Sequence, residues 1–247
     1  MRVRMHMRDC LADLDIFGCI LQGESWFGWR VLLIAAAGEG LTDDERAEFK
    51  RLTGRDREPG RFCRELIVAA GRRAGKTQAL ICFAVWIAVF CDYRGVLAPG
   101  ETGTVLIVSQ TQHWSREILN RAEGVFLHGD PHKSPLPSMI VRRTADSIDL
   151  NNGIRLEVRP ASFRTLRGPT YVAVIADEIA FWYTSVDYAN PDTEILAAVR
   201  PGLLTTHGPL LMASSVYAKT GVLYDSYKRY FGLAGPPDIL VADQTQS

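Results

Sequence analysis

The stretch that decides the fold of this chain is Leu66-Ile67-Val68-Ala69-Ala70-Gly71-Arg72-Arg73-Ala74-Gly75-Lys76-Thr77. An apolar run of strand length leads into a glycine-containing turn, and Gly-Lys-Thr then opens an apolar helical segment that extends to Cys91. A strand, a glycine-containing turn and a helix in this order are the layout of a P-loop, which binds the phosphates of a nucleotide. The sequence therefore predicts a phosphate-binding loop here.

Each residue type in this loop has a physical role. Gly75 lets the backbone curl so that successive N–H groups point at phosphate oxygens, and the following helix adds the positive end of its dipole. Lys76 is predicted to reach the β- and γ-phosphates, and Thr77 to place its hydroxyl on Mg²⁺. The usual spacing puts a glycine where this chain has Ala70, so Gly71 comes one residue late. The predicted nucleotide-binding residues are Gly71, Arg72, Arg73, Ala74, Gly75, Lys76, Thr77 and Gln78.

A second motif lies at the end of a later apolar run. Residues 171–176 have the pattern of a buried strand, and Asp177-Glu178 follow it directly. A carboxylate at a strand end opposite a P-loop threonine can hold Mg²⁺ through water, so we assign Thr77 and Asp177 to the metal. A second carboxylate beside it can accept a proton from the attacking water, which makes Glu178 the predicted general base. Acidic residues at strand ends are common, so this interpretation depends on the pairing with the phosphate loop.

Two arginines lie inside the loop itself. An arginine at this place can touch the γ-phosphate and stabilise charge as the bond breaks. The alternative is that one or both face solvent or pair with acidic residues. We assign the catalytic role to Arg72, and for Arg73 we favour the alternative.

Apolar runs of strand length alternate with helical patterns along the chain. The predicted strands lie at about residues 66–70, 104–109, 171–176, 210–213 and 239–241. This alternation predicts an α/β fold of the P-loop NTPase class (ASCE/RecA-like), with a central, mainly parallel sheet flanked by helices. Ligands bind at the carboxyl ends of such strands, and the phosphate loop, Asp177-Glu178 and Ser214-Ser215 all follow strands.

Helices and short strands complete the predicted elements. Helices are expected at about residues 25–37, 42–52, 112–122, 190–200 and 221–231, and short strands at 140–143, 147–150 and 154–158. Thr42 and Glu45 form a capping box at the start of the second helix. Residues 1–22 are expected to be a short helical or irregular lead-in. We divide the chain into an N-terminal helical lead-in at 1–60, packed on the core, and a P-loop ATPase core at 61–247.

Composition excludes several classes of protein. Apolar residues make up 47% of the 247 residues, which predicts a packed globule rather than disorder. The chain has 28 basic and 28 acidic residues, so a uniformly basic surface for nucleic acid is absent, while a local patch stays possible. The five cysteines show no CxxC spacing, which indicates reduced, structural thiols. We find no pattern of a secretory signal and no apolar run long enough to span a membrane.

Taken together, these motifs make the sequence resemble the large terminase subunit of tailed bacteriophages, the ATPase that packages DNA into the capsid. The phosphate loop has the shortened form of that family, with an arginine at its second position. Arg167-Gly168 come shortly before the strand that ends in Asp177-Glu178, and Ser214-Ser215 resemble the family's coupling motif. The likeness covers about residues 25–245.

The resemblance implies a function and partners. It implies that the chain is the ATPase domain of a viral DNA-packaging motor, which hydrolyses ATP with Mg²⁺ to translocate double-stranded DNA into a procapsid. The implied partners are double-stranded DNA, the portal protein, the small terminase subunit and further copies of the chain in a homo-oligomeric ring on the portal. The implied location is the host cytoplasm during virion assembly, without a membrane partner. Ser214 or Ser215 would sense the γ-phosphate and couple its state to movement.

The resemblance also favours Arg167 as an arginine that enters the site of a neighbouring subunit. Arg167 lies on a turn-prone segment before the second motif, and we expect that turn to lie near the strand ends that carry the site. Arg164 is the runner-up. The alternative is that these arginines contact DNA phosphates or a local acidic residue.

Two features depart from the family pattern. Full-length members carry a C-terminal nuclease domain, whereas Asp225, Asp238 and Asp243 are scattered here, so we expect an isolated ATPase domain or a truncated gene without nuclease activity. The glutamine often found on the adenine side is unclear, because Trp29-Arg30 occupy the region where it is expected. The aromatic residues at 26, 27 and 29 are expected to be core or to pack at the edge of ATP.

Two other functions stay open at this point. A helicase-like ATPase of another family would need a second RecA-like lobe, for which 247 residues leave no room. A nucleotide-binding module that only assembles would not need a general base, so Glu178 argues against it.

Overall fold

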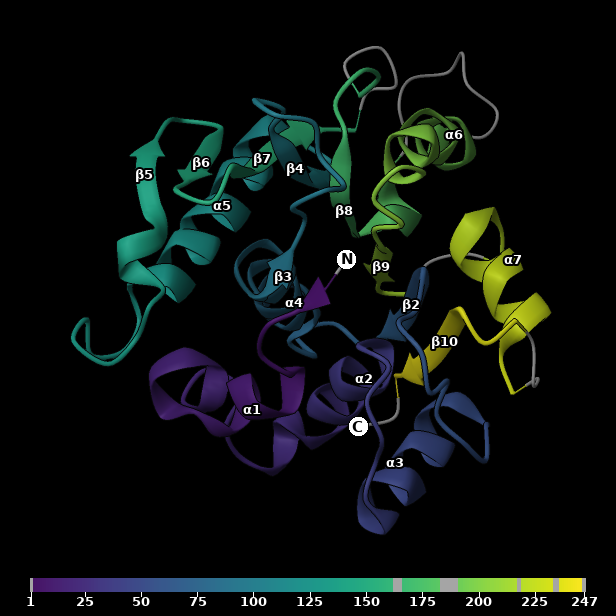
Figure 1. Ribbon diagram of the computed structural model, residues 1–247. Coiled ribbons are helices and arrows are strands. Elements are labelled where there is room, and N and C mark those ends of the chain that lie inside the picture. The colour runs from purple at the N-terminus through teal and green to yellow at the C-terminus, as the bar shows by residue number, and fades with distance from the viewer. Residues whose placement is uncertain (1, 162–165, 183–190, 217–218, 233–235, 246–247) are drawn as a thin grey trace.

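The computed structural model describes residues 2–161, 166–182, 191–216, 219–232 and 236–245. Its centre is an eight-stranded sheet with the order β10-β2-β9-β8-β4-β7-β6-β5 (Figure 1). The parallel strands are β2 (Glu65–Ala70), β4 (Gly103–Ser109), β7 (Ile154–Pro160), β8 (Tyr171–Asp177), β9 (Leu210–Ser214) and β10 (Ile239–Gln244). The strands β5 (Ile140–Arg143) and β6 (Ser147–Leu150) continue the sheet in antiparallel pairing.

Helices cover both faces of this sheet. They are α1 (Met7–Ala12), α2 (Phe27–Ala36), α3 (Asp43–Thr53), α4 (Lys76–Phe90), α5 (Gln112–Leu127), α6 (Pro191–Leu203) and α7 (Gly221–Tyr230). Shorter turns of helix lie at Leu14–Gly18, Glu24–Trp26, Pro137–Met139 and Ile179–Phe181. The predicted α/β fold of the P-loop class, with a mainly parallel sheet between helices, is confirmed. None of the described helices is both long enough and apolar enough to cross a bilayer.

The central strands are apolar along their whole length because both of their faces are buried. In β2, Leu66 and Val68 pack into one hydrophobic cluster, together with α2 and α4, while Ile67 packs into a second cluster on the other face. In β4, Ile107 joins the first cluster and Leu106 the second. Successive side chains of a strand point to opposite faces, so a strand between two helical layers needs an unbroken apolar run.

The apolar segment after the phosphate loop is the helix α4. Its residues from Ala79 to Phe90 are all buried, which explains why the run has no polar face. Trp86 within it donates its indole N–H to the carbonyl of Met5 at 2.9 Å. The prediction of an apolar helix after the phosphate loop is confirmed, and the helix ends at Phe90, one residue before Cys91.

Several predicted boundaries need correction. The helix expected to end near residue 122 extends to Leu127, because Val125 and Phe126 are buried against the core and outweigh the low helix propensity of Gly124. The helix α6 passes Pro201 and ends at Leu203, which packs into the second cluster. Residues 1–22 also contain a strand, β1 (Arg2–Val3), which pairs with β3 (Cys91–Asp92). Residue 190, where this helix is predicted to begin, lies outside the described residues.

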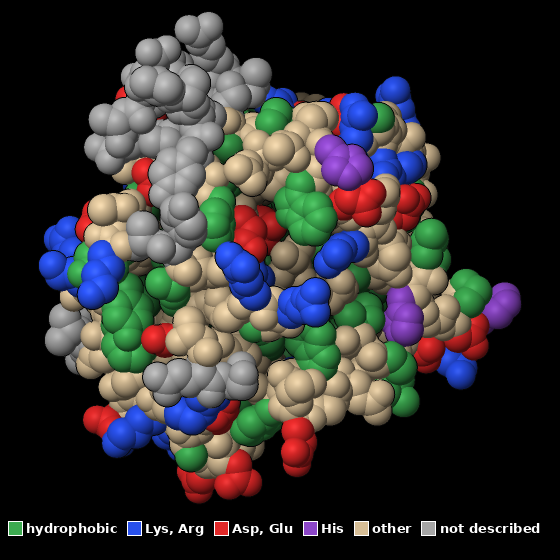
Figure 2. Space-filling view, turned by 180° about the vertical axis from the view of Figure 1, so that it is seen from behind, with side chains coloured by type: hydrophobic (Ala, Val, Ile, Leu, Met, Phe, Trp, Pro, Cys, Tyr) green, Lys and Arg blue, Asp and Glu red, His purple; other side chains and the backbone are tan. Residues whose placement is uncertain are grey.

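The N-terminal helices share the first hydrophobic cluster with α4. Thr42 and Glu45 form the predicted capping box at the start of α3, and Gly54, with φ 68°, ends that helix. The division of the chain at residue 60 into a lead-in and a core stays a prediction. Figure 2 shows Lys and Arg side chains in small groups among acidic and uncharged ones on one face of the molecule, with no continuous basic surface there.

Glu58 anchors the segment between α3 and β2. Its carboxylate accepts hydrogen bonds from the backbone N–H of Leu41 and from the guanidinium of Arg46, each at 3.1 Å. The bond from Arg46 is the main cause that lowers the pKa of Glu58 from 4.5 to about 2, against the opposing effect of burial. The charged form is therefore stabilised by folding, and this contribution is present above about pH 4.5 and lost as the pH falls towards 2.

We predict that Glu58→Gln lowers the free energy of unfolding at pH 7 by ~1–2 kcal/mol, because the partly exposed Arg46 loses its charged acceptor. The difference from the wild type should shrink as the pH falls below about 4.5. Urea unfolding at a series of pH values measures it. Asp56→Asn, which removes the exposed partner of Lys50 at the end of α3, is the control and should leave the free energy of unfolding close to that of the wild type. A Glu58→Gln difference that persists unchanged down to pH 2.5 would contradict the assignment.

Candidate functional site

The phosphate loop connects β2 to α4 at the carboxyl end of the strand. Gly75 has φ 75°, in the left-handed region, and lies immediately before the first residue of α4. A Cβ atom at this position would lie 2.5 Å from the ring of Trp26. Glycine is therefore required here by the backbone conformation and by the close approach of an aromatic ring. No side chain caps this end of α4, so its first N–H groups remain open to an anion.

The loop is also tied to the helix before it. The indole N–H of Trp29 donates to the carbonyl of Ala74 at 2.6 Å. Beside the loop, a cleft of about 600 Å³ is lined by Ser25, Trp26, Gly71, Arg72, Arg73, Ala74, Gly75, Gln244 and Thr245. Trp26 and Trp29 thus fix the loop from one side, in agreement with the expectation that they are core or pack at the edge of a nucleotide.

Lys76 meets the second motif. Its ammonium lies 2.9 Å from Oε1 of Glu178 and donates to the hydroxyl of Ser215 at 3.1 Å. The lysine is only 6% exposed, so its charge depends on these partners. The fold therefore brings the predicted phosphate ligand and the predicted general base into direct contact.

Thr77 meets the other carboxylate. Its hydroxyl donates to Oδ1 of Asp177 at 2.9 Å, between residues 100 positions apart in the sequence. The indole N–H of Trp114 donates to Oδ2 at 3.2 Å. Burial is the largest effect on the Asp177 carboxyl and raises its pKa, and the negative charge of Glu178 raises the pKa further. The hydrogen bonds from Thr77 and Trp114 and the positive charge of Lys76 lower the pKa but do not outweigh burial.

Glu178 stands at a sharp change of backbone direction. It has φ 53°, an uncommon conformation for a residue other than glycine, and it directly precedes the helical turn Ile179–Phe181. Its Oε2 accepts hydrogen bonds from the hydroxyl of Ser214 at 3.1 Å and from the N–H of Ser215 at 3.0 Å. Both serines lie at the end of β9, between the strands that carry the two motifs. The predicted coupling residues therefore contact the predicted base directly.

Neither loop arginine forms an ion pair with these carboxylates. Arg72 and Arg73 are exposed, line the cleft, and form no ion pair with another described residue. Arg73 has φ 62°, in the left-handed region. Gln78 lies partly exposed in the first turn of α4. The cleft beside the phosphate loop therefore has two exposed guanidinium groups in its lining.

Arg167 lies at the other end of β8 from Asp177. The segment before β8 returns to the amino ends of the strands, because β8 runs parallel to β4, and the carbonyl of Thr170 accepts a hydrogen bond from Thr104 near the start of β4. Arg167 lines a cleft with Pro201 at the end of α6. The expectation that this turn lies near the strand ends of the site is wrong. The length of β8, at ~3.3 Å per residue, separates Arg167 from the phosphate loop of the same chain. Arg164 lies outside the described residues.

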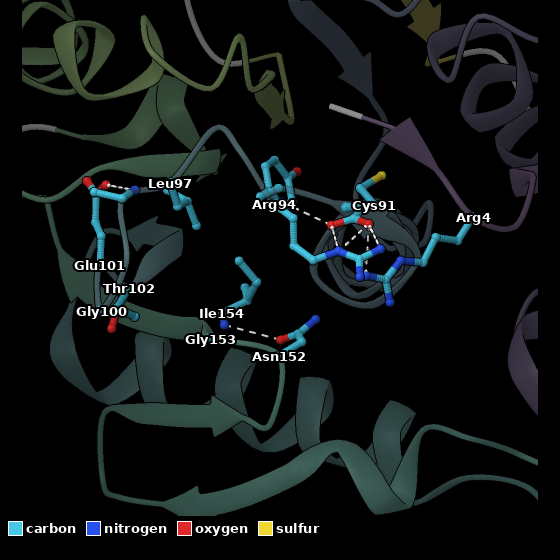
Figure 3. Close-up of a pocket in the computed structure, with 13 residues that line it drawn as sticks. Arg4, Cys91, Arg94, Leu97, Gly100, Glu101, Thr102, Asn152, Gly153 and Ile154 are labelled. Atoms are coloured by element: carbon cyan, nitrogen blue, oxygen red, sulfur yellow. Dashed lines mark hydrogen bonds and ion pairs between the residues drawn. The ribbon is translucent and has the colours of Figure 1, made fainter.

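A further cleft, of about 450 Å³, lies away from this site (Figure 3). It is lined by Thr102, directly before β4, and by Ile154, the first residue of β7, so it lies at the amino ends of these strands and not at the carboxyl ends that carry the phosphate loop. Its two arginines, Arg4 and Arg94, both bind the carboxylate of Asp92. None of the described residues that the sequence predicts for the site lines this cleft.

Sequence reasoning missed Trp114, and it missed Trp182, whose indole N–H donates to the backbone carbonyl of Asp177 at 2.9 Å. Trp114 follows the end of β4, so the rule that ligands gather at the carboxyl ends of parallel strands contained a signal for it. Trp182 follows the end of β8 in the same way, so the same rule applied to it, whereas the direction of its indole depends on the turn at Glu178.

Neither the comparison with protein-family models nor that with curated proteins gives a match to this chain. Among solved structures, the chain is similar to the large terminase of bacteriophage HK97, with a TM-score of 0.51 and 14% identity over 74% of this chain and 35% of that chain. The large terminase ATPase domain of Thermus phage P74-26 gives a TM-score of 0.44 at 16% identity, over 67% of this chain and 64% of that chain, and a mutant of it gives 0.46 at 17%, over 75% and 76%. In fold, this chain is thus similar to a phage large terminase, and it spans about a third of the length of the HK97 protein.

Proposed function

We propose that the chain is the ATPase domain of a viral DNA-packaging motor, which hydrolyses ATP to translocate double-stranded DNA into a procapsid. One observation carries the ATPase part of the proposal: Lys76 and Thr77 of the phosphate loop each bind one member of the Asp177-Glu178 pair. The proposed phosphate ligand is thus paired with the proposed general base, and the two proposed metal ligands are paired with each other. The terminase-like fold supports the motor part.

The oxygen atoms at Thr77 and Asp177 suit Mg²⁺. A hydroxyl and a carboxylate are hard ligands, and Mg²⁺ is commonly held by one or two carboxylates together with phosphates and water. Among the described residues there is no group of three or more His, Cys, Asp or Glu side chains that could form an all-protein metal site. When bound, Mg²⁺ neutralises charge on the phosphate oxygens.

The other residues have roles that follow from their contacts. Lys76 exchanges Glu178 for the β- and γ-phosphates of ATP, which frees Oε1 of Glu178 to accept a proton from the attacking water. Ser214 and Ser215 hold Oε2 of Glu178, so movement of β9 changes the orientation of the base. We assign the nucleobase and the ribose of the bound nucleotide to the cleft beside Trp26.

The exposed arginines complete the charge compensation. Arg72, which is exposed on the phosphate loop beside the cleft, contacts a terminal phosphate oxygen of the bound nucleotide, whereas Arg73 faces solvent. Arg167 acts on the site of a neighbouring copy, since it lies at the far end of β8 from its own loop. A homo-oligomeric ring on a portal, together with double-stranded DNA and a small terminase subunit in the host cytoplasm, is the assembly that this arrangement would serve.

We predict that Lys76→Ala abolishes ATP hydrolysis, because no other described ammonium lies at the loop. A phosphate-release assay measures turnover. Lys50→Ala, which removes an exposed ion pair with Asp56, is the matched control and should hydrolyse ATP normally. Turnover at the wild-type rate in Lys76→Ala would remove the phosphate-loop assignment.

We predict that Glu178→Gln binds ATP but hydrolyses it ~10²-fold more slowly or worse, because an amide keeps an acceptor for Ser215 and cannot take a proton. Binding is measured with a fluorescent ATP analogue, and turnover by phosphate release. Asp177→Asn is the comparison and should weaken binding in the presence of Mg²⁺. Normal hydrolysis by Glu178→Gln together with an inactive Asp177→Asn would mean that the two roles are misassigned.

We predict that Arg167→Ala is inactive alone and that mixing it with Lys76→Ala restores part of the activity. Each variant lacks a different half of a shared site, so mixed neighbours contain complete ones, and an arginine acting in trans can contribute ~10³–10⁵ in rate. Activity is followed across mixing ratios, with assembly checked by light scattering. No recovery at any ratio in confirmed assemblies would exclude the trans role.

A further inference from the structure

The carboxylate of Asp177 is held at both oxygens. Thr77 donates to Oδ1 at 2.9 Å, and the indole N–H of Trp114 donates to Oδ2 at 3.2 Å. The terminal torsion of an aspartate is broad, so a single donor leaves the carboxylate free to rotate, whereas two donors on different oxygens fix its plane. Each oxygen keeps a further lone pair, so both can still accept from water.

Core packing does not explain the position of Trp114. It is 38% exposed, which is unusual for a large apolar side chain. The guanidinium of Arg121, two helix turns further along α5, lies 5.6 Å from the centre of the Trp114 ring. An exposed indole with its N–H on a buried carboxylate is explained by that hydrogen bond and not by burial of its ring.

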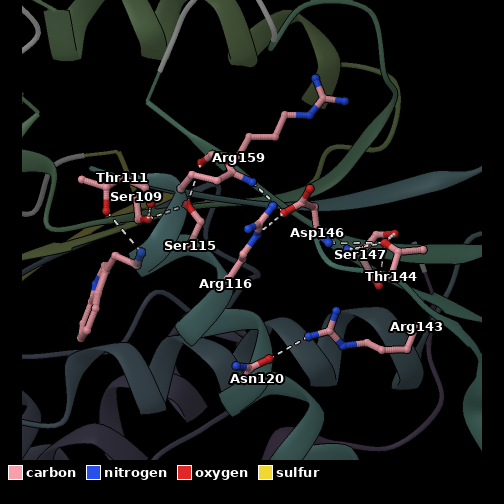
Figure 4. Close-up of polar contacts among 12 residues, drawn as sticks. Ser109, Thr111, Ser115, Arg116, Asn120, Arg143, Thr144, Asp146, Ser147 and Arg159 are labelled. Atoms are coloured by element: carbon pink, nitrogen blue, oxygen red, sulfur yellow. Dashed lines mark hydrogen bonds and ion pairs between the residues drawn. The ribbon is translucent and has the colours of Figure 1, made fainter.

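The first turn of α5 is anchored so that Trp114 is held in position. The hydroxyl of Thr111 accepts from the N–H of Trp114 at 3.2 Å and caps the helix. The hydroxyls of Ser109 and Ser115 lie 2.7 Å apart, and Ser115 also donates to the carbonyl of Arg159 at 3.3 Å (Figure 4). These bonds tie the start of α5 to the carboxyl ends of β4 and β7, on the same edge of the sheet as Asp177.

We propose that Trp114 is a positioning residue that orients the Asp177 carboxylate for the Mg²⁺ of a bound nucleotide. This inference rests on the proposed ATPase function. Donors outside the metal shell fix the direction of its ligands, and their loss typically costs ~10–100-fold in metal affinity or activity. Trp114 acts through Asp177 alone, so it affects the Mg²⁺-dependent part of nucleotide binding and leaves the Mg²⁺-free part unchanged.

The test uses Trp114→Phe, which keeps an aromatic ring for Arg121 and removes the N–H. A fluorescent ATP analogue is titrated with excess EDTA and then over a range of Mg²⁺ concentrations. We expect unchanged binding in EDTA and an Mg²⁺ requirement ~10-fold higher than in the wild type. Arg121→Gln is the matched control, because it removes the cation over the ring and keeps the N–H; it should follow the wild type.

Two further measurements keep the result decisive. Thermal unfolding shows whether Trp114→Phe is folded, as its exposed position leads us to expect. In the Asp177→Asn background, Trp114→Phe should have no further effect on the Mg²⁺ requirement, because the residue through which it acts has been changed. A shift of the same size in both backgrounds would overturn the proposal.

The inference and the proposed function fail in different ways. If the wild type binds no nucleotide with or without Mg²⁺, the ATPase proposal is wrong. If the wild type shows Mg²⁺-enhanced binding and Trp114→Phe has the same Mg²⁺ requirement, the ATPase proposal stands and the role of Trp114 is wrong.

Discussion

Lys76 carries a positive charge into a position that is 6% exposed, and the carboxylate of Glu178 at 2.9 Å compensates it. Removing one partner of a fully buried pair costs ~3–5 kcal/mol, and the 28% exposure of the Glu178 side chain reduces that cost here. Glu178 is itself placed by the left-handed turn at the end of β8. The position of the phosphate loop, the end of β8 and the end of β9 therefore depend on one another through this pair of charges.

The strand order brings the end of β9 to the contact between Lys76 and Glu178. Because β9 lies between β2 and β8, its last residues meet both the lysine of the loop and the glutamate of the second motif. Ser215 contacts both groups, through its hydroxyl and its N–H, and Ser214 contacts Glu178. A ligand that draws Lys76 away from Glu178 would change the forces on the end of β9. We therefore propose that the inserted strand is the element through which the state of the site reaches the rest of the domain.

Two kinds of cation surround the site. Lys76 is buried and paired, whereas Arg72 and Arg73 are exposed on the loop and form no ion pair with a described residue. Arg167 belongs to neither group, because a residue before a parallel strand lies at the amino end of that strand. This topology is the reason why its proposed role requires a second copy of the chain. The described side chains that donate to Asp177 are Thr77 and two tryptophans, not a further arginine.

The sequence by itself determined the layers of the fold and the members of the site that follow strands. Unbroken apolar runs required strands buried on both faces, and Gly75-Lys76-Thr77 and Asp177-Glu178 were placed on the same edge of the sheet because parallel strands have their carboxyl ends at one edge. Only the tertiary structure decided that Lys76 binds Glu178, that Trp114 binds Asp177, and that Arg167 lies away from the site. These facts depend on strand order, helix rotation and loop direction, which are set by packing between distant segments and leave no local pattern in the sequence.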